Sequence, residues 1–324
     1  MFFPLRLHMF GKRLPMENSI TWREAERLFF REGPFSHINS SHIEDGFIFE
    51  CDEERSLALL YMALAARETG TVILAYALMT NHFHFIVKGR RGGEFFQNFR
   101  QRMSLYLSRH GRPGLLDGMT FKETPITSLN QFYTEVAYVL RNPFVVSPSV
   151  NLLSYPWCSG YLYFNKLIEY LPLRKPSELS FRERRVIAKN SNGELPEWIS
   201  VLDGMISPIS FVDYRLVEAL FRTPREFLNS CFKNVEAQVE LALRIDEKPV
   251  LTDEELFRHL KKKIDTDYQL AEFKLLSRNQ KGEILKYLKY KIGTSNGQIA
   301  RVLHLSQIEV DSFFPLTAKN PGVL

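Results

Sequence analysis

Residues 71–88 read TVILAYALMTNHFHFIVK, and this stretch decides the fold. The runs Thr71–Leu78 and Phe83–Lys88 are rich in β-branched and aromatic residues, which favour β-strands. A short segment around Met79–Asn81 separates them, which is the spacing of a hairpin. The stretch therefore predicts two neighbouring antiparallel strands.

Two histidines begin the second of these strands. Alternate side chains of a strand share a face, so His82 and His84 point the same way while Phe83 and Phe85 point into the core. Two imidazoles on one rigid strand supply half of a divalent-metal site. The alternative is a pair of histidines on a sheet face with no metal, and the motif alone does not decide between them.

The surrounding sequence predicts helices and further extended segments. An extended stretch is expected at His37–His42 and another at Gly46–Glu50. Helices are expected over Trp22–Arg31, Glu53–Glu68, Glu94–Arg109 and Leu129–Arg141, the last stopped by Pro143. Strand signals fade after Asn165, and helices are expected at Phe211–Phe221, Pro224–Asn229, Asp253–Lys263 and Lys281–Lys291. The fold class is therefore α+β, an antiparallel sheet flanked by helices and followed by an all-helical C-terminal region.

A domain boundary is expected near Leu173–Ser177, where the sequence LPLRKPS contains two prolines. On this basis the chain has an N-terminal extension (1–34), an α+β domain (35–175), a helical connector (176–250) and a terminal helical domain (251–324).

Composition narrows the class of protein. Forty-two Lys+Arg against thirty-seven Asp+Glu give a net charge of +5, which mildly favours a polyanionic partner. The three cysteines, Cys51, Cys158 and Cys231, show no C-x-x-C spacing, so we expect buried thiols and neither a zinc site nor disulfides. No run approaches transmembrane length, and the opening segment is too interrupted by charge for a signal peptide. A soluble cytoplasmic protein is expected.

A second chemical element lies in the stretch TEVAYVLRNP, residues 134–143. Tyr138 and Asn142 are four residues apart and so neighbours on one helix surface. A phenol has a pKa near 10, so a tyrosine that attacks phosphate needs a metal and a neighbour to hold that metal. Asn142 could supply a third ligand through its amide oxygen. The alternative is a core aromatic beside a helix-capping asparagine.

Three motifs together resemble a known family. In order and spacing, Leu78–Val87 (LMTNHFHFIV), Tyr138–Pro143 (YVLRNP) and Ser154–Tyr161 (SYPWCSGY) are similar to the REP-associated tyrosine transposases of the HUH single-tyrosine superfamily. The resemblance spans His37 to Phe164. It implies a ferredoxin-like sheet with the histidine motif on a central strand.

The same resemblance implies a mechanism. His82 and His84 would bind Mg²⁺ or Mn²⁺, Asn142 would complete the protein ligands, and Tyr138 would form a 5′-phosphotyrosine link with single-stranded or hairpin DNA. Tyr106, in a basic stretch, competes for the role of nucleophile, whereas Tyr133 has no amide partner one turn later. We favour Tyr138.

Cationic residues concentrate after the histidine motif, where they would attract a phosphate backbone. The resemblance adds Lys122 to this group. The expected DNA-binding residues are Lys88, Arg90, Arg91, Arg100, Arg102 and Lys122. Phe95, Phe96 and Phe99 lie among them, and their spacing favours core positions over base stacking.

A second DNA-binding element is expected near the C-terminus. The stretch Gln298–Ser306 with Val310 resembles a helix-turn-helix, with His304 at the turn position that glycine usually holds. Its second helix would carry Gln307, Glu309 and Asp311 and would read duplex DNA. A plain helical packing domain is the alternative.

Three functions remain in competition. The favoured hypothesis is a transposase, a metal-dependent single-stranded DNA endonuclease and strand transferase that acts as a monomer or homodimer. The rival is a non-catalytic DNA-binding regulator with the same fold. The third is a structural α+β protein in which the histidines have no chemical role.

Overall fold

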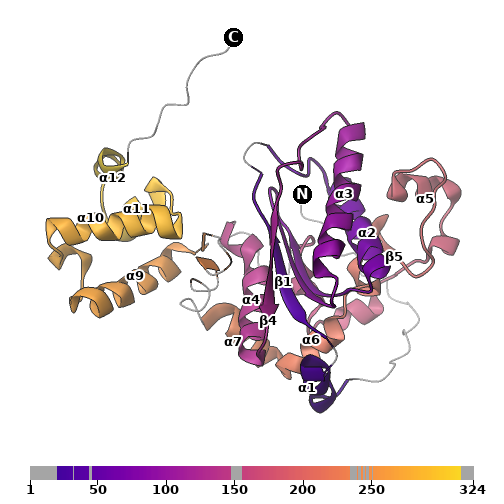
Figure 1. Cartoon of the computed structure of the whole chain (residues 1–324), viewed down its shortest axis with the longest axis horizontal. Coiled ribbons are helices and arrows are strands. Elements are labelled where there is room, and N and C mark those ends of the chain that lie inside the picture. Colours follow the sequence, from indigo (N-terminus) through magenta and orange to yellow (C-terminus); the bar gives the residue numbers. More distant parts are fainter. Residues whose placement is uncertain are drawn as a thin grey trace, which may run out of the picture. The chain divides into compact units, whose positions relative to one another are not determined.

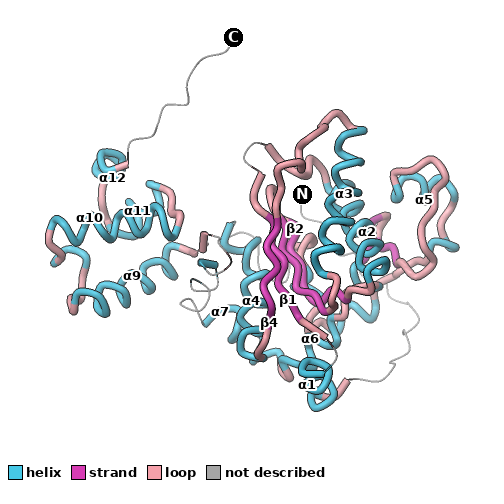
Figure 2. Tube along the Cα trace, in the orientation of Figure 1, coloured by secondary structure: helices cyan, strands magenta, loops and turns pink. Residues whose placement is uncertain are grey.

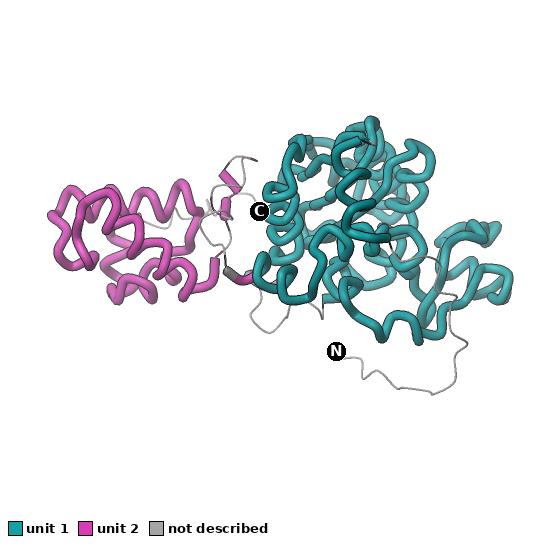
Figure 3. Tube along the Cα trace, turned by 90° about the horizontal axis from the view of Figure 1, so that it is seen from below, with its two compact units in different colours: residues 1–231 teal, residues 232–324 magenta. Residues whose placement is uncertain are grey.

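The computed structural model describes residues 20–314 except 32, 44–45, 147–154, 234–238, 240–241, 244, 246–247 and 250. Most of the expected N-terminal extension and Ser154 of the third motif therefore lie outside the described residues. The chain divides into two compact units, Met1–Cys231 and Phe232–Leu324 (Figure 3). The first unit thus extends well beyond the boundary expected near Leu173–Ser177.

The first unit is built on a four-stranded antiparallel sheet (Figure 2). Its strands are β1 (Phe35–Ser40), β2 (Val72–Leu78), β3 (Phe83–Lys88) and β4 (Phe121–Ile126), in the order β2-β3-β1-β4. With one helix after β1 and another after β3, this is the ferredoxin-like arrangement, and β3 is a central strand. The α+β class and the β2–β3 hairpin are confirmed. The segment 46–50, expected to be extended, forms no strand.

Two helices cover one face of the sheet, α2 (Asp52–Thr69) and α3 (Gly92–Arg109) (Figure 1). The core between these layers contains Ile38, Phe83 and Phe85, all fully buried. The predicted core role of the three α3 phenylalanines is confirmed, because Phe95, Phe96 and Phe99 are also fully buried.

The opposite face of the sheet carries α4 (Leu129–Val146), which packs beside α1 (Trp22–Arg31), α6 (Tyr214–Phe221) and α7 (Pro224–Lys233). Phe132 of α4 meets Phe35 of β1 edge to face, with ring centroids 5.9 Å apart. Helix α4 does not stop before Pro143 as expected but continues to Val146. The proline removes one backbone hydrogen bond close to the end of the helix, so the disturbance is confined to its last turns.

The segment after the expected boundary is not purely helical. Strands β5 (Ser200–Leu202) and β6 (Met205–Ser207) form a small antiparallel pair, and Val201 and Ile206 join the core under α2. Strands of three residues are too short to show alternation, so sequence periodicity could not predict them. The other elements here are α5 (Phe181–Ala188) and the 3₁₀ turns η1 (Ser159–Leu162), η2 (Lys166–Tyr170), η3 (Pro176–Glu178) and η4 (Pro208–Ser210).

The second unit is helical in its described residues. It contains α9 (Asp253–Tyr268), η5 (Phe273–Leu275), α10 (Arg278–Lys286), the π-helical η6 (Tyr287–Ile292), α11 (Asn296–Leu303) and α12 (Gln307–Phe313). Ile299 of α11 and Val310 of α12 are fully buried in a core of this unit alone.

The turn between α11 and α12 has the local geometry expected of its sequence. His304 takes up a left-handed conformation with φ of 53°, which supports its place in the turn. The α12 acids have partners within the unit: Glu309 accepts from the Ser306 backbone N–H, and Asp311 accepts from the Asn296 amide. Binding of duplex DNA by this pair stays a prediction.

Two of the three cysteines are buried as expected, Cys158 and Cys231, whereas Cys51 is exposed because it immediately precedes α2 at the surface. Among the described residues, no helix combines the length and apolar character needed to cross a membrane.

Candidate functional site

The sheet face beneath α4 carries a cluster of histidines. His84 of β3 lies opposite Asn39 of β1, and His37 lies two residues before Asn39 on β1, so these side chains share a face. The rings of His82 and His84 have centroids 4.8 Å apart, and these residues are only 7% and 0% exposed. The predicted shared direction of His82 and His84 is confirmed by this proximity.

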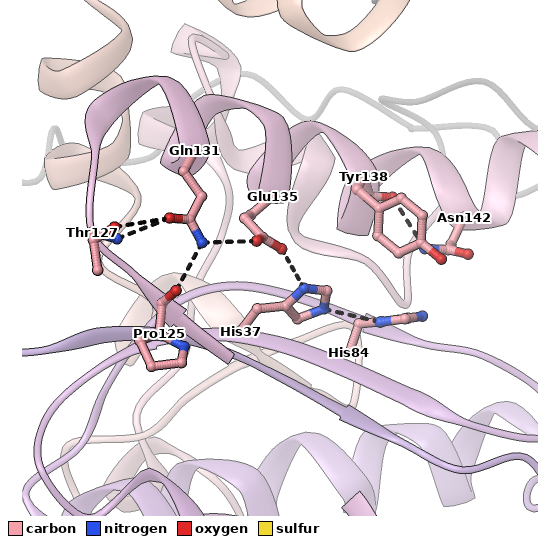
Figure 4. A network of polar contacts seen from close by, with 8 residues as sticks. All are labelled: His37, His84, Pro125, Thr127, Gln131, Glu135, Tyr138 and Asn142. Atoms are coloured by element: carbon pink, nitrogen blue, oxygen red, sulfur yellow. Dashed lines mark hydrogen bonds and ion pairs between the residues drawn. The ribbon is translucent and has the colours of Figure 1, made fainter. Parts of the chain in front are cut away.

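Helix α4 turns a polar stripe toward these histidines (Figure 4). Gln131, Glu135, Tyr138 and Asn142 follow at spacings of four, three and four, which place them on one side of a helix. The Tyr138 ring lies against His84, with centroids 5.6 Å apart. Asn142 lies one turn later, and its Nδ2 donates to the Tyr138 backbone carbonyl at 3.0 Å.

Both histidines of the motif are oriented through Nδ1. His82 Nδ1 donates to Asn81 Oδ1 at 2.8 Å, and His84 Nδ1 lies 3.2 Å from His37 Nε2. Metal-binding histidines are commonly fixed in this way through the ring nitrogen that does not bind the metal. Burial is the largest cause that holds the pKa of His84 well below its usual range. His84 is therefore a neutral imidazole, which is the form that binds a metal.

These residues fit a divalent ion with mixed nitrogen and oxygen ligands. Among the described residues no group of three or more His, Cys, Asp or Glu side chains could hold a metal ion. Among residues of other types, Asn142 offers an amide oxygen, because its nitrogen is engaged on its own helix. Convergence of His82, His84 and Asn142 on one ion stays a prediction.

Three further residues of the site were not predicted from the sequence. His37 and Glu135 form a fully buried pair with Nδ1 and Oε2 2.6 Å apart. His42 is exposed, and its ring centroid lies 4.1 Å from that of His82. Polar residues at helical spacing in an otherwise apolar helix, here Gln131 and Glu135, are the signal that could have pointed to the pair.

The three candidate tyrosines have different surroundings. Tyr106 belongs to the core under α2 and α3, on the other face of the sheet, and stacks on His110. Tyr133 donates its hydroxyl to the Leu220 carbonyl at 2.9 Å, toward α6. Burial raises the pKa of both phenols. Of the three, Tyr138 is the one beside the histidines, and it is itself only 5% exposed.

The predicted DNA-binding residues are spread over both sides of the sheet. Lys122 lies opposite Asn39, which lies opposite His84, so the three form one row across the α4 face. Arg91 pairs with Glu94, and Arg102 pairs with Glu68. Arg100 donates to the Met119 carbonyl. Lys88 is the last residue of β3 and Arg90 follows two residues later, so both are several residues from His84 along the chain. A DNA-binding role for these six residues stays a prediction.

Comparison with known proteins adds one structural likeness. No protein-family model and no curated protein matches the chain. A solved structure of a REP-associated tyrosine transposase bound to a REP hairpin aligns with a TM-score of 0.34 and 12% sequence identity, over 51% of this chain and 92% of that one.

Proposed function

We propose that this chain is a metal-dependent single-stranded DNA endonuclease and strand transferase of the transposase kind. Tyr138 is the nucleophile, and His82, His84 and Asn142 hold Mg²⁺ or Mn²⁺. The observation that carries the proposal is the contact of the Tyr138 ring with His84, 5.6 Å between centroids, with Asn142 one turn further along α4. A tyrosine, a histidine and an asparagine thus lie close together where a helix faces a sheet, which supports the proposal.

The chemistry needs a tyrosine beside a Lewis acid. The bound ion would supply that acidity by polarising a non-bridging phosphate oxygen. The Tyr138 oxygen attacks phosphorus, the bond from phosphorus to the 3′ oxygen breaks, and a 5′-phosphotyrosine forms. The proton lost by the phenol balances the one that the departing 3′ oxygen takes up. Attack by another 3′-hydroxyl on the phosphotyrosine reverses these steps and joins the strands.

The positive charge of the site suits a nucleic-acid backbone. Two neutral imidazoles and an amide would not neutralise the +2 charge of a divalent ion. The ion would therefore attract negatively charged phosphate oxygens as further ligands. Lys122 stands in the same row of the sheet as His84 and is proposed to contact phosphate there. Lys88, Arg90, Arg91, Arg100 and Arg102 are proposed to attract single-stranded or hairpin DNA over a longer range.

Replacement of Tyr138 by Phe tests the nucleophile, since it removes one oxygen and little else. Wild-type protein, Mn²⁺ and hairpin-bearing single-stranded DNA should give an adduct that survives denaturation. We expect Tyr138→Phe to form none while its DNA affinity stays within about threefold, because binding depends on contacts to many phosphates. Tyr106→Phe is the matched control, with the same atom removed on the other face of the sheet.

Two results would contradict this assignment. An adduct formed by Tyr138→Phe but not by Tyr106→Phe would move the nucleophile to α3. Absence of any adduct from the wild type, with DNA binding intact and unchanged by chelation, would favour the non-catalytic regulator. We expect His82→Ala, His84→Ala and chelation of the metal each to suppress the adduct.

A further inference from the structure

A chain of polar groups runs from α4 to His84 (Figure 4). Gln131 Nε2 donates to Glu135 Oε1 at 3.3 Å, and Glu135 Oε2 lies 2.6 Å from His37 Nδ1. His37 Nε2 lies in turn 3.2 Å from His84 Nδ1. Glu135, His37 and His84 are each 0% exposed. Water therefore does not compete for their hydrogen bonds, and the donor and acceptor of each bond are determined by the neighbouring residues.

The carboxylate fixes that direction. An ionised carboxylate only accepts hydrogen bonds, so His37 places its proton on Nδ1 and donates it to Glu135. Gln131 donates to the other carboxylate oxygen and stabilises the same form. A neutral His37 then has its lone pair on Nε2, where it accepts the proton of His84 Nδ1. The lone pair of His84 is consequently on Nε2.

We propose that Glu135 and His37 are positioning residues that set the tautomer of His84 and thereby make Nε2 its metal-binding atom. The inference rests on the proposed function in taking His84 as a metal ligand. The tautomer itself is a property of the metal-free protein. In other metal sites, hydrogen-bond partners orient the histidine ligands in the same way. Loss of such a partner weakens metal affinity by about 10- to 100-fold.

Replacement of Glu135 by Gln should reverse the chain. The new amide nitrogen can donate to His37 Nδ1, which leaves the His37 proton on Nε2. His37 then donates to His84 Nδ1, and the His84 proton moves to Nε2, where it blocks the metal. The matched control is Glu123→Gln, which removes the same charge from β4 at a carboxylate that accepts from the Ser36 hydroxyl at 2.8 Å, on the α3 side of the sheet.

The first measurement is ¹⁵N NMR of the imidazoles in the metal-free protein at one fixed pH, with His84→Gln used to assign the signal. We expect the protonated nitrogen of His84 to be Nδ1 in the wild type and in Glu123→Gln, and Nε2 in Glu135→Gln. The wild-type spectrum is decisive even if Glu135→Gln fails to fold. A wild-type His84 protonated at Nε2 overturns the proposal.

The second measurement is Mn²⁺ affinity, from the electron paramagnetic resonance signal of the free ion. We expect Glu135→Gln to bind Mn²⁺ about 10- to 100-fold more weakly and Glu123→Gln to match the wild type. Equal affinities in all three proteins overturn the positioning role and leave the metal site standing. Absence of Mn²⁺ binding from a wild type whose His84 is protonated at Nδ1 supports the tautomer and overturns the proposed function.

Discussion

Phe132 packs α4 against the sheet, and its replacement should lower the free energy of unfolding of the first unit. The side chain is fully buried, between Phe35 at 5.9 Å and Phe29 at 5.8 Å from ring centroid to centroid. Phe132→Ala removes these edge contacts and leaves a cavity, which costs about 3–5 kcal/mol. A domain of typical stability, about 5–15 kcal/mol, remains folded after such a loss.

Tryptophan fluorescence isolates this effect. Trp22, Trp157 and Trp198 all lie in the first unit, so urea unfolding followed by their emission reports on that unit alone. With a slope of about 2–3 kcal/mol per molar urea, the midpoint should fall by about 1–2.5 M.

Phe30→Ala is the matched control. Phe30 follows Phe29 in α1, but its side chain is 62% exposed. It should change the unfolding free energy by about 0.5 kcal/mol or less. A loss below about 1 kcal/mol for Phe132→Ala, or an equal loss for Phe30→Ala, would refute the packing of α4 and α1 on this face.

Three further predictions test other parts of the structure. Native protein should show one fast-reacting thiol, Cys51, because burial raises the pKa of Cys158 and of Cys231 to about 12. Cys51→Ser should remove the fast phase of a thiol assay. A fast phase that remains in this variant would contradict the burial of Cys158 and Cys231. Ser159→Ala should cost about 1–3 kcal/mol in urea unfolding, because the buried Tyr76 N–H loses the hydroxyl that accepts from it at 3.0 Å. Hydrogen bonds from Arg174 and then Ser180 lower the pKa of Glu183 to about 2, so the stability it contributes is present above its ordinary pKa of 4.5 and lost as the pH falls toward 2; an NMR titration of Arg174→Gln should show this pKa closer to 4.5, and an unchanged value would exclude the pair as its cause.

Local periodicity explains what the sequence could predict. The β2–β3 hairpin, the shared face of His82 and His84, and the placement of Tyr138 and Asn142 one turn apart all follow from residues close together in the chain. Strand parity and helix register are fixed by backbone geometry, so such features need no knowledge of the tertiary structure.

The features that the sequence did not predict depend on distant contacts. His37 and Glu135 are 98 residues apart, and only the packing of α4 against β1 brings them together. Strand β4 carries Pro125 and three charged or polar residues in six, because an edge strand tolerates them, and it therefore lacks the usual alternation. The later boundary between units has the same origin, since Val201 and Ile206 complete a core begun by α2.

The most direct test of the central claim locates the covalent bond itself. Wild-type protein would be incubated with Mn²⁺ and hairpin-bearing single-stranded DNA, digested with protease and nuclease, and sequenced by tandem mass spectrometry. The geometry beside His84 predicts a nucleotide phosphate on the side chain of Tyr138. A nucleotide on Tyr106 or Tyr133, or none on any peptide while the DNA is cut, would contradict the account.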